Sequence, residues 1–315
     1  MSTVKIEDIA YVRFQAPDLV EMRRFLQDFG LHCETRNGRL FGRGSDGSPF
    51  AHVTETGPPR FAGLGFRASS REDLEALAAQ DRVTVRDADV PGGGYVVTLT
   101  DPDGNAIDVV AEQVRANPEP GPAQPAVNSI EVRRRVRSPI RFEPGPSHVH
   151  RLGHAVLIVR DFEVSQAWYK DRFGLLTSDQ VEVVRGAPIG AFLRCDRGDL
   201  PTDHHTLFLV QAPDAPGFHH AAFEVIGFDD LMLGHSYLRS RGREHSQGIG
   251  RHKLGSQIFD YWKDPWGHEL EHWTDGDLFT AKDPPGVAGL EDLLGVIWHS
   301  QRGPHTVTPK PRVSD

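Results

Sequence analysis

The sequence is poor in cysteine and in positive charge. Its 315 residues contain only Cys33 and Cys195, which excludes both a disulfide framework and a metal site built from thiolates. Lysine and arginine number 35 against 44 aspartate and glutamate residues, a net charge of −9. Nothing in this balance favours nucleic acid or an anionic membrane as a partner.

Long apolar runs are also missing. No stretch approaches the roughly 18 apolar residues of a membrane span. Lys5, Glu7 and Asp8 interrupt the region in which a signal peptide would be continuously apolar. We therefore expect a soluble, cytoplasmic protein that binds neither membrane nor nucleic acid. With 38% hydrophobic and 25% charged residues, the chain has the composition of a folded globular protein.

Histidine is the residue in excess. The chain has 16, and 14 of them follow residue 147, so that only His32 and His52 fall in the first half. This asymmetry indicates that the two halves differ in chemistry.

The two halves nevertheless share one pattern. Residues 8–31 and 152–175 each combine an alternating apolar strand, an acidic turn, an amphipathic segment and Phe-Gly-Leu. In the first copy the apolar residues recur at three- and four-residue steps, and Gly30 is the expected helix stop. Residues 95–108 and 259–271 match as two strands joined by an Asp-Pro-X-Gly turn. The chain is therefore interpreted as a duplication.

The predicted fold class is α+β. Each half reads as paired βαβββ units that form a curved, barrel-like mixed sheet with helices outside. We place an N-terminal module without metal at 1–115, a catalytic metal-binding module at 148–280, and a tail at 281–315 that either covers the site or docks on the sheet. Between the modules, 116–147 is a connector rich in Pro, Gly and Arg, and its arginine run 131–137 is expected to be a solvated strand.

The copies differ at three aligned positions. The second copy has two imidazoles and one carboxylate where the first has residues that could not form the same site. The aligned pairs are His154 and Ala10, His220 and Gly63, and Glu271 and Asp108. Two His and one carboxylate with open coordination positions is the arrangement of non-haem Fe(II) oxygenases. Taken singly, each of these residues is more often a core histidine or a solvated glutamate than a ligand.

The chain resembles the two-domain type I extradiol ring-cleavage dioxygenases of the vicinal oxygen chelate superfamily, from about Ile6 to about Thr280. The most specific motifs are Leu152-Gly-His154, His204-His205-Thr206, His219-His220, Gly250-Arg251-His252, Tyr261, and Asp264-Pro-Trp-Gly-His-Glu-Leu-Glu271. The resemblance implies that His154, His220 and Glu271 hold Fe(II), with Mn(II) as the alternative, and that O2 and a catecholic molecule are the substrates. It also implies a homo-oligomer, for which we expect a tetramer.

The resemblance implies further roles near the metal. It assigns acid–base catalysis to His205 and makes His252 and Tyr261 catalytic residues that also line the substrate pocket. Alternation along a strand leaves His204 as the rival of His205 and His219 as the rival of His220, although the repeat alignment favours His220. The remaining expected substrate contacts are Gln247, Arg251 and Trp298.

Other histidines and the second cysteine are given simpler roles. We expect surface or supporting positions for His268 and His272, with His272 pointing away from Glu271. Loop positions are expected for His148, His150 and His245, and Cys195 is expected to be packed rather than reactive.

The predicted activity is cleavage of a substituted catechol or trihydroxybenzene next to the diol, giving a muconic semialdehyde-type product. One rival is a glyoxalase-like isomerase or epimerase, but such enzymes build their site from both halves, and Ala10, Gly63 and Asp108 disfavour this. The other rival is a non-catalytic small-molecule-binding module, which has no need of three ligands together with His205 and Tyr261.

Overall fold

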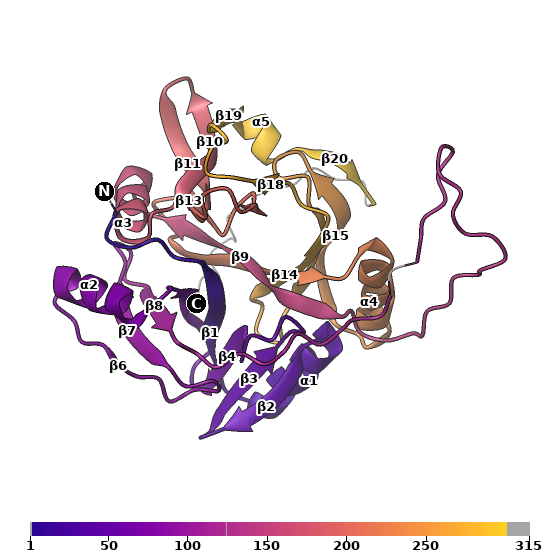
Figure 1. The fold of residues 1–315 in the computed structure, drawn as a ribbon, viewed down its shortest axis with the longest axis horizontal. Helices are drawn as coiled ribbons and strands as arrows, with labels where there is room; N and C mark the ends of the chain where they lie inside the picture. Colours follow the sequence, from indigo (N-terminus) through magenta and orange to yellow (C-terminus); the bar gives the residue numbers. More distant parts are fainter. Residues whose placement is uncertain (1, 124, 301–315) are drawn as a thin grey trace, which may run out of the picture.

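Two large mixed sheets form the protein, one from each half of the chain, with the helices at the periphery (Figure 1). The computed structural model describes residues 2–123 and 125–300. The first sheet has eight strands in the order β2-β3-β4-β1-β5-β8-β7-β6, and the second has ten in the order β19-β10-β11-β13-β9-β14-β17-β16-β15-β20. The predicted α+β class with two tandem modules of curved mixed sheets is confirmed.

The first sheet and its helices occupy residues 8–111. Its elements are β1 (Asp8–Ala16), α1 (Leu19–Phe29), β2 (His32–Arg36), β3 (Arg39–Arg43), β4 (His52–Thr56), β5 (Arg60–Arg67), α2 (Arg71–Asp81), β6 (Arg86–Asp87), β7 (Tyr95–Thr100) and β8 (Ala106–Ala111).

The second half carries the larger sheet and one further two-stranded pair, β12 with β18. Its elements are β9 (Val149–Val159), α3 (Phe162–Phe173), β10 (Leu176–Val184), β11 (Ala187–Arg194), β12 (Thr202–Asp203), β13 (Leu207–Gln211), β14 (Gly217–Val225), α4 (Phe228–Ser240), β15 (Glu244–His252), β16 (Ile258–Lys263), β17 (Glu269–Thr274), β18 (Leu278–Phe279), β19 (Gly286–Gly289), α5 (Leu290–Leu293) and β20 (Val296–His299).

Strand pairing shows the duplication directly. In each sheet two strands run antiparallel at the centre, β1 with β5 and β9 with β14. Each central strand pairs on its other side with a parallel strand, β4, β8, β13 and β17 respectively. Each sheet therefore consists of two βαβββ units related by an approximate twofold arrangement.

The ends of α1 and α3 carry capping residues, among them the predicted Gly30. Asp18 accepts hydrogen bonds from two backbone amides of the first turn of α1, and Gly30 ends that helix with φ 107°. Asp161 and Gly174 perform the same functions for α3. Because a residue with a β-carbon resists positive φ, glycine is favoured at the C-terminal ends of both α1 and α3.

The Asp-Pro-X-Gly hairpins also form as predicted. Asp101 and Asp264 each accept hydrogen bonds from the backbone amides two and four residues later. Gly104 and Gly267 close these turns with φ near 90°. The turns set the register of β7 with β8 and of β16 with β17, and β17 carries Glu271.

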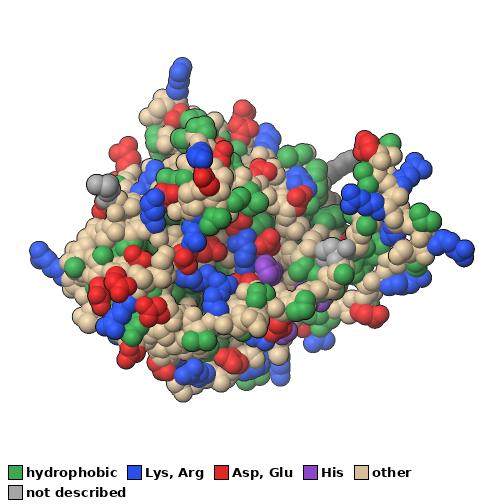
Figure 2. Space-filling model, in the orientation of Figure 1, with side chains coloured by type: hydrophobic (Ala, Val, Ile, Leu, Met, Phe, Trp, Pro, Cys, Tyr) green, Lys and Arg blue, Asp and Glu red, His purple; other side chains and the backbone are tan. Residues whose placement is uncertain are grey.

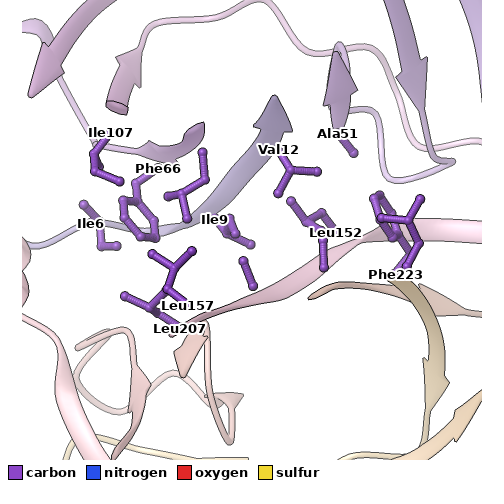
Figure 3. Packing of buried hydrophobic residues seen from close by; sticks show 14 of the residues in the cluster. Ile6, Ile9, Val12, Ala51, Phe66, Ile107, Leu152, Leu157, Leu207 and Phe223 are labelled. Atoms are coloured by element: carbon purple, nitrogen blue, oxygen red, sulfur yellow. The ribbon is translucent and has the colours of Figure 1, made fainter. Parts of the chain in front are cut away.

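The two halves share one hydrophobic core. Buried residues of β1, such as Ile9 and Val12, belong to the same cluster as Leu152 and Leu157 of β9 (Figure 3). Aromatic pairs add to this contact: Phe29 lies 5.6 Å from Phe223, measured between ring centroids. The modules are therefore packed against each other rather than joined only by the linker.

Residues 112–148 contain no helix or strand among those described. Both ends of this segment bond to the body of the protein, and its middle part forms the long loop that projects in Figure 1. The expected strand over the arginine run is absent from the described linker. With no neighbouring strand to pair with, its backbone bonds locally, as where Asn128 Oδ1 accepts the amide of Arg135. Basic side chains of this segment face solvent (Figure 2).

The tail belongs to the second sheet. β19 pairs in parallel with β10 at one edge, and β20 pairs antiparallel with β15 at the other edge. Residues 286–299 thus connect the two edges of the sheet, so the expectation of a docked strand is met in part. Residues 301–315 lie outside the described residues. Among those described, no helix is both long and apolar enough to cross a membrane.

Candidate metal centre and active site

Three adjacent strands of the second sheet carry His154, His220 and Glu271. The order β9-β14-β17 makes these strands neighbours, with His154 on β9, His220 on β14 and Glu271 on β17. The register pairs Ala222 with His154 on one side and with Glu271 on the other. His220 lies two residues before Ala222, so all three side chains meet on one face of the sheet.

The three potential ligand groups converge within a small, buried volume. One ligand atom of each lies within 4.8 Å of the others. Glu271 Oε2 is 3.2 Å from His220 Nε2 and 3.6 Å from His154 Nε2. All three residues are buried, and the Glu271 side chain is only 1% exposed.

Several buried polar atoms of this cluster have no well-aligned hydrogen bond within the described part of the chain. Among the described residues, no hydrogen bond in acceptable geometry reaches either carboxylate oxygen of Glu271 or Nδ1 of His154. Burial raises the pKa of Glu271, but His154 and His220 outweigh it and hold the pKa well below its usual range. Burial lowers the pKa of His154, which favours the neutral imidazole. An anionic carboxylate with two imidazoles fits a divalent transition metal.

The corresponding place in the first module is filled. Asp108, aligned with Glu271, accepts hydrogen bonds from Tyr11 Oη at 3.0 Å, Arg13 Nη1 at 2.9 Å and Thr98 Oγ1 at 2.6 Å. The Tyr11 ring lies where a β-carbon on Gly65 would be. The carboxylate of Asp108 is therefore satisfied by protein donors, whereas that of Glu271 is not.

A neighbouring histidine orients His220. His219 Nδ1 and His220 Nδ1 are 2.8 Å apart, and a register irregularity between Phe218 and His220 lets these adjacent side chains approach. A hydrogen bond between the two Nδ1 atoms leaves Nε2 of His220 directed at Glu271. Such an outer partner fixes the tautomer of a ligand histidine.

His205, rather than His204, lies beside the ligands. Its ring centroid is 3.9 Å from that of His154, whereas His204 Nε2 bonds to Asp179 Oδ2 at 2.7 Å. Both residues lie in the loop before β13 and not on a strand, which corrects the strand alternation assumed from sequence. Burial, and next the proximity of His154, lowers the pKa of His205 well below its usual value.

His252 and Tyr261 meet on neighbouring strands. His252 Nε2 is 3.1 Å from Tyr261 Oη, and its ring stacks on Phe259 at 4.1 Å. Tyr261 is paired in register with Glu271, and its ring centroid is 5.1 Å from that of His220. Burial, reinforced by the Glu271 carboxylate, raises the pKa of Tyr261 well above its usual value, so the phenol keeps its proton.

Of the three further substrate contacts expected from sequence, one lies opposite Tyr261 and two lie away from the cluster. Gln247 is opposite Tyr261 in the β15–β16 register. Arg251 donates to the Ser256 carbonyl at 2.6 Å and to Asp275 at 2.7 Å, so its guanidinium is already engaged. Trp298 is 40% exposed, and its ring centroid lies 6.4 Å from that of Phe228 at the start of α4. The structure does not bring Arg251 or Trp298 to the ligand cluster.

Several other histidines differ from their expected settings. His272 does point away from Glu271, but it is fully buried, and its Nε2 bonds to the Phe29 carbonyl at 2.7 Å. It therefore links the two modules and has no surface role. His150 lies on β9 and His245 on β15, so these two are not loop residues, whereas His148 lies in the loop before β9. The strands that pair with these segments are distant in sequence, so the local sequence did not predict that His150 and His245 lie on strands.

The structure also adds residues that the sequence did not single out. The Trp273 ring packs over Gly153, and its centroid lies 6.1 Å from that of His154. From the tail, the His299 ring is 5.9 Å from that of Phe259. The only available signal was the position of Trp273 two residues after Glu271, on the same face of one strand.

This chain is similar to known proteins over the segments that carry the cluster. The family model described as the Glyoxalase/Bleomycin resistance protein/Dioxygenase superfamily matches residues 151–272. Metapyrocatechase 2 of Cupriavidus necator is 30% identical to this chain over 311 residues, covering 92% of this chain and 88% of that protein.

Two solved structures are similar over nearly their whole length. The Mn(II)-bound glyoxalase from Novosphingobium aromaticivorans has a TM-score of 0.79 at 20% identity, covering 98% of this chain and 95% of that one. Homoprotocatechuate 2,3-dioxygenase from Brevibacterium fuscum, in complex with 3,4-dihydroxyphenylacetate, has a TM-score of 0.75 at 18% identity, covering 92% and 88%. At these identities the two likenesses show the fold.

Proposed function

Because this chain belongs to the extradiol dioxygenases of the Glyoxalase/Bleomycin resistance protein/Dioxygenase superfamily, we propose that it cleaves a catechol ring with O2 beside the vicinal diol. The observation that carries the proposal is the buried, unsatisfied cluster of His154, His220 and Glu271, with His205 and Tyr261 beside it. Both oxygen atoms enter the product, a muconic semialdehyde-type acid.

A metal ion would be held by the two imidazoles and the carboxylate, and we propose Fe(II). It would supply the place where the diol and O2 bind together and exchange electrons. Imidazole and carboxylate also suit Mn(II), and the similar glyoxalase structure is Mn(II)-bound.

His205 and Tyr261 have different roles: the first accepts and returns a proton, and the second donates a hydrogen bond. A neutral His205 can accept a proton from the diol at its unprotonated ring nitrogen and return it as the ring opens, since the lowered pKa keeps the imidazole uncharged beforehand. Tyr261 remains a donor because its pKa is raised, and it can hydrogen-bond to a developing negative oxygen. His252 holds that hydroxyl in place from 3.1 Å.

The wall beside His205 favours an apolar substituent on the ring. Val156 follows His154 by two residues on β9 and so faces the same side. It clusters with Phe192 and Phe208, and the Phe192 ring centroid is 4.9 Å from that of His205. With Arg251 engaged by Asp275, we propose an alkyl- or aryl-substituted catechol in preference to a carboxylated one.

The rival isomerase is disfavoured by the first module, because Asp108 is satisfied by three protein donors and Tyr11 occupies the neighbouring space. A pure binding module does not account for the unsatisfied Glu271.

The direct test is oxygen uptake by protein loaded anaerobically with Fe(II). We expect uptake and a yellow ring-fission product with methyl- or phenyl-substituted catechols, and a lower kcat/KM with 3,4-dihydroxyphenylacetate. If no catechol elicits uptake and neither iron nor manganese is retained, the proposed activity is wrong.

Two substitutions separate the roles within the site. His205→Phe is expected to retain metal and to lose turnover by about 100-fold or more, the usual contribution of an acid–base group. Glu271→Ala is expected to lose the metal itself. His32→Phe, at an exposed strand position of the first module, serves as the matched control. Metal loss in His205→Phe with retention in Glu271→Ala would reverse the assignment.

A further inference from the structure

A second group of two imidazoles and one carboxylate lies in the C-terminal module. It consists of His235 on α4, His245 on β15 and Asp260 on β16. Asp260 directly precedes Tyr261, and successive residues of a strand point to opposite faces. The group therefore lies on the helix-covered side of the sheet, away from the side to which Tyr261 points.

The distances within this group suit a metal ion. Asp260 Oδ1 is 2.8 Å from His245 Nε2 and 3.3 Å from His235 Nδ1, and the latter also lies 3.1 Å from Oδ2. A tetrahedral ion with bonds of about 2.0–2.1 Å places neighbouring ligand atoms roughly 3.3 Å apart. Adjustments of a few tenths of an ångström would convert these contacts into a coordination sphere.

The charge of Asp260 favours a cation at this place. The side chain has no exposed surface, and among the described residues its ion pairs are with histidines alone, not with lysine or arginine. A buried carboxylate with no lysine or arginine beside it is costly unless another cationic group balances its charge. Burial raises the pKa of Asp260, but hydrogen bonds from the two histidines outweigh it, so the pKa lies below its usual value.

The surroundings resemble the outer partners of a metal site. Trp262 Nε1 donates to Asp260 Oδ2 at 2.7 Å, which fixes the carboxylate plane with Oδ1 towards the two histidines. The His235 side chain is 21% exposed and that of His245 is 8% exposed. Solvent therefore reaches the group past His235 and can supply a fourth ligand.

We propose that His235, His245 and Asp260 form a second metal site, which binds Zn²⁺ or a similar borderline divalent ion with one water. Imidazole and carboxylate together suit such ions. Each imidazole would release the proton of the nitrogen that faces Asp260. Because the ligands come from α4, β15 and β16, the ion would clamp the helix to the hairpin that carries His252 and Tyr261.

The test counts Zn²⁺ bound to the full-length, chelator-treated protein by equilibrium dialysis and metal analysis. We expect two ions per chain for the unaltered protein and for the control His32→Gln. One ion is expected for Glu271→Ala and for His235→Gln, and none for the double variant. His245→Gln provides a second, independent removal of one ligand.

A second readout is the thermal midpoint in the Glu271→Ala background. Zn²⁺ should raise it, and adding His235→Gln should abolish the rise and weaken Zn²⁺ binding at least about tenfold. If His235→Gln and His245→Gln both bind as many ions as the unaltered protein, the second site does not exist. Neither measurement depends on dioxygenase activity. A failure of this proposal can therefore be distinguished from a failure of the proposed function.

Discussion

His52, His154 and His272 are all buried, yet their ring nitrogens meet different partners. His154 faces Glu271, and His272 bonds to the Phe29 carbonyl across the module boundary. His52 stacks on Phe14 at 5.0 Å between centroids, and among the described residues its Nε2 has no hydrogen-bond partner. Residue type alone therefore does not identify a candidate ligand; the groups around the ring nitrogens distinguish these three buried histidines.

His52 leads to a prediction about acid stability. Burial lowers its pKa from 6.5 to about 3, so the folded state resists protonation that the unfolded state accepts. The associated stability is complete above pH 6.5 and declines as the pH falls from there towards 3. The unfolding free energy of the unaltered protein should fall as the pH is lowered from 7.5 to 5.5. In His52→Phe, which keeps the ring stack, this fall should be smaller by about 1.4 kcal/mol.

Urea unfolding at the two pH values measures this difference, with His32→Phe as the exposed control. An unchanged acid sensitivity in His52→Phe would show that His52 is not the residue responsible. His154, His205 and His272, whose pKa values burial also lowers, account for the remaining sensitivity.

At the scale of elements, the site depends on how closely β9 and β17 approach. Gly153 precedes His154, and a β-carbon there would lie 2.5 Å from the Trp273 ring. Trp273 is buried on β17, two residues beyond Glu271, and the Arg151 guanidinium lies over its ring at 5.5 Å. The absence of a side chain at Gly153 thus allows Trp273 to support the backbone that presents His154.

Gly153→Ala should therefore weaken metal binding without removing a ligand. Overpacking of this kind costs about 1–3 kcal/mol of stability, and displaced supporting groups lower metal affinity about 10- to 100-fold. Metal affinity and thermal unfolding measure both effects. Gly145→Ala, in the linker with no atom within 4 Å of the added carbon, is the matched control. Equal metal affinity in the two variants would contradict the argument.

At the scale of the whole molecule, the two modules share one hydrophobic core. Their buried apolar residues form one cluster, and β1 and β9 lie against each other across it (Figure 3). Tyr169 of α3 donates to Asp101 of the first module at 2.9 Å, a buried hydrogen bond across the boundary. The first module therefore packs against the module that carries the His154, His220 and Glu271 cluster.

One cooperative transition is expected in calorimetry of the metal-free chain, since separating the modules would expose the shared core. A fragment of residues 148–300 should fail to unfold cooperatively, because Leu152, Leu157 and Phe223 would face water. Two resolved transitions in the full chain, or a cooperative fragment, would show that the modules fold independently.

Much of the fold could be predicted from local signals. Asp18, Gly30 and the Asp-Pro-X-Gly turns act within a few residues, so the ends of α1 and the β16–β17 hairpin followed from sequence. The setting of His205 in a loop could not be predicted, because only the packing of β12 and β13 decides where that segment bends. The engagement of Arg251 by Asp275 joins residues 24 positions apart and has no local signal.

By itself, the sequence determined the duplicated module, the hairpins and the half of the chain that carries the histidine-rich site, because periodicity and turn chemistry are local properties. Only the tertiary structure decided which histidines face a carboxylate without donors, which are held by protein partners, and how residues 286–299 join both edges of the sheet. These outcomes depend on strand register and burial. They arise from contacts between residues far apart in the chain, and a local pattern of residue types does not contain them.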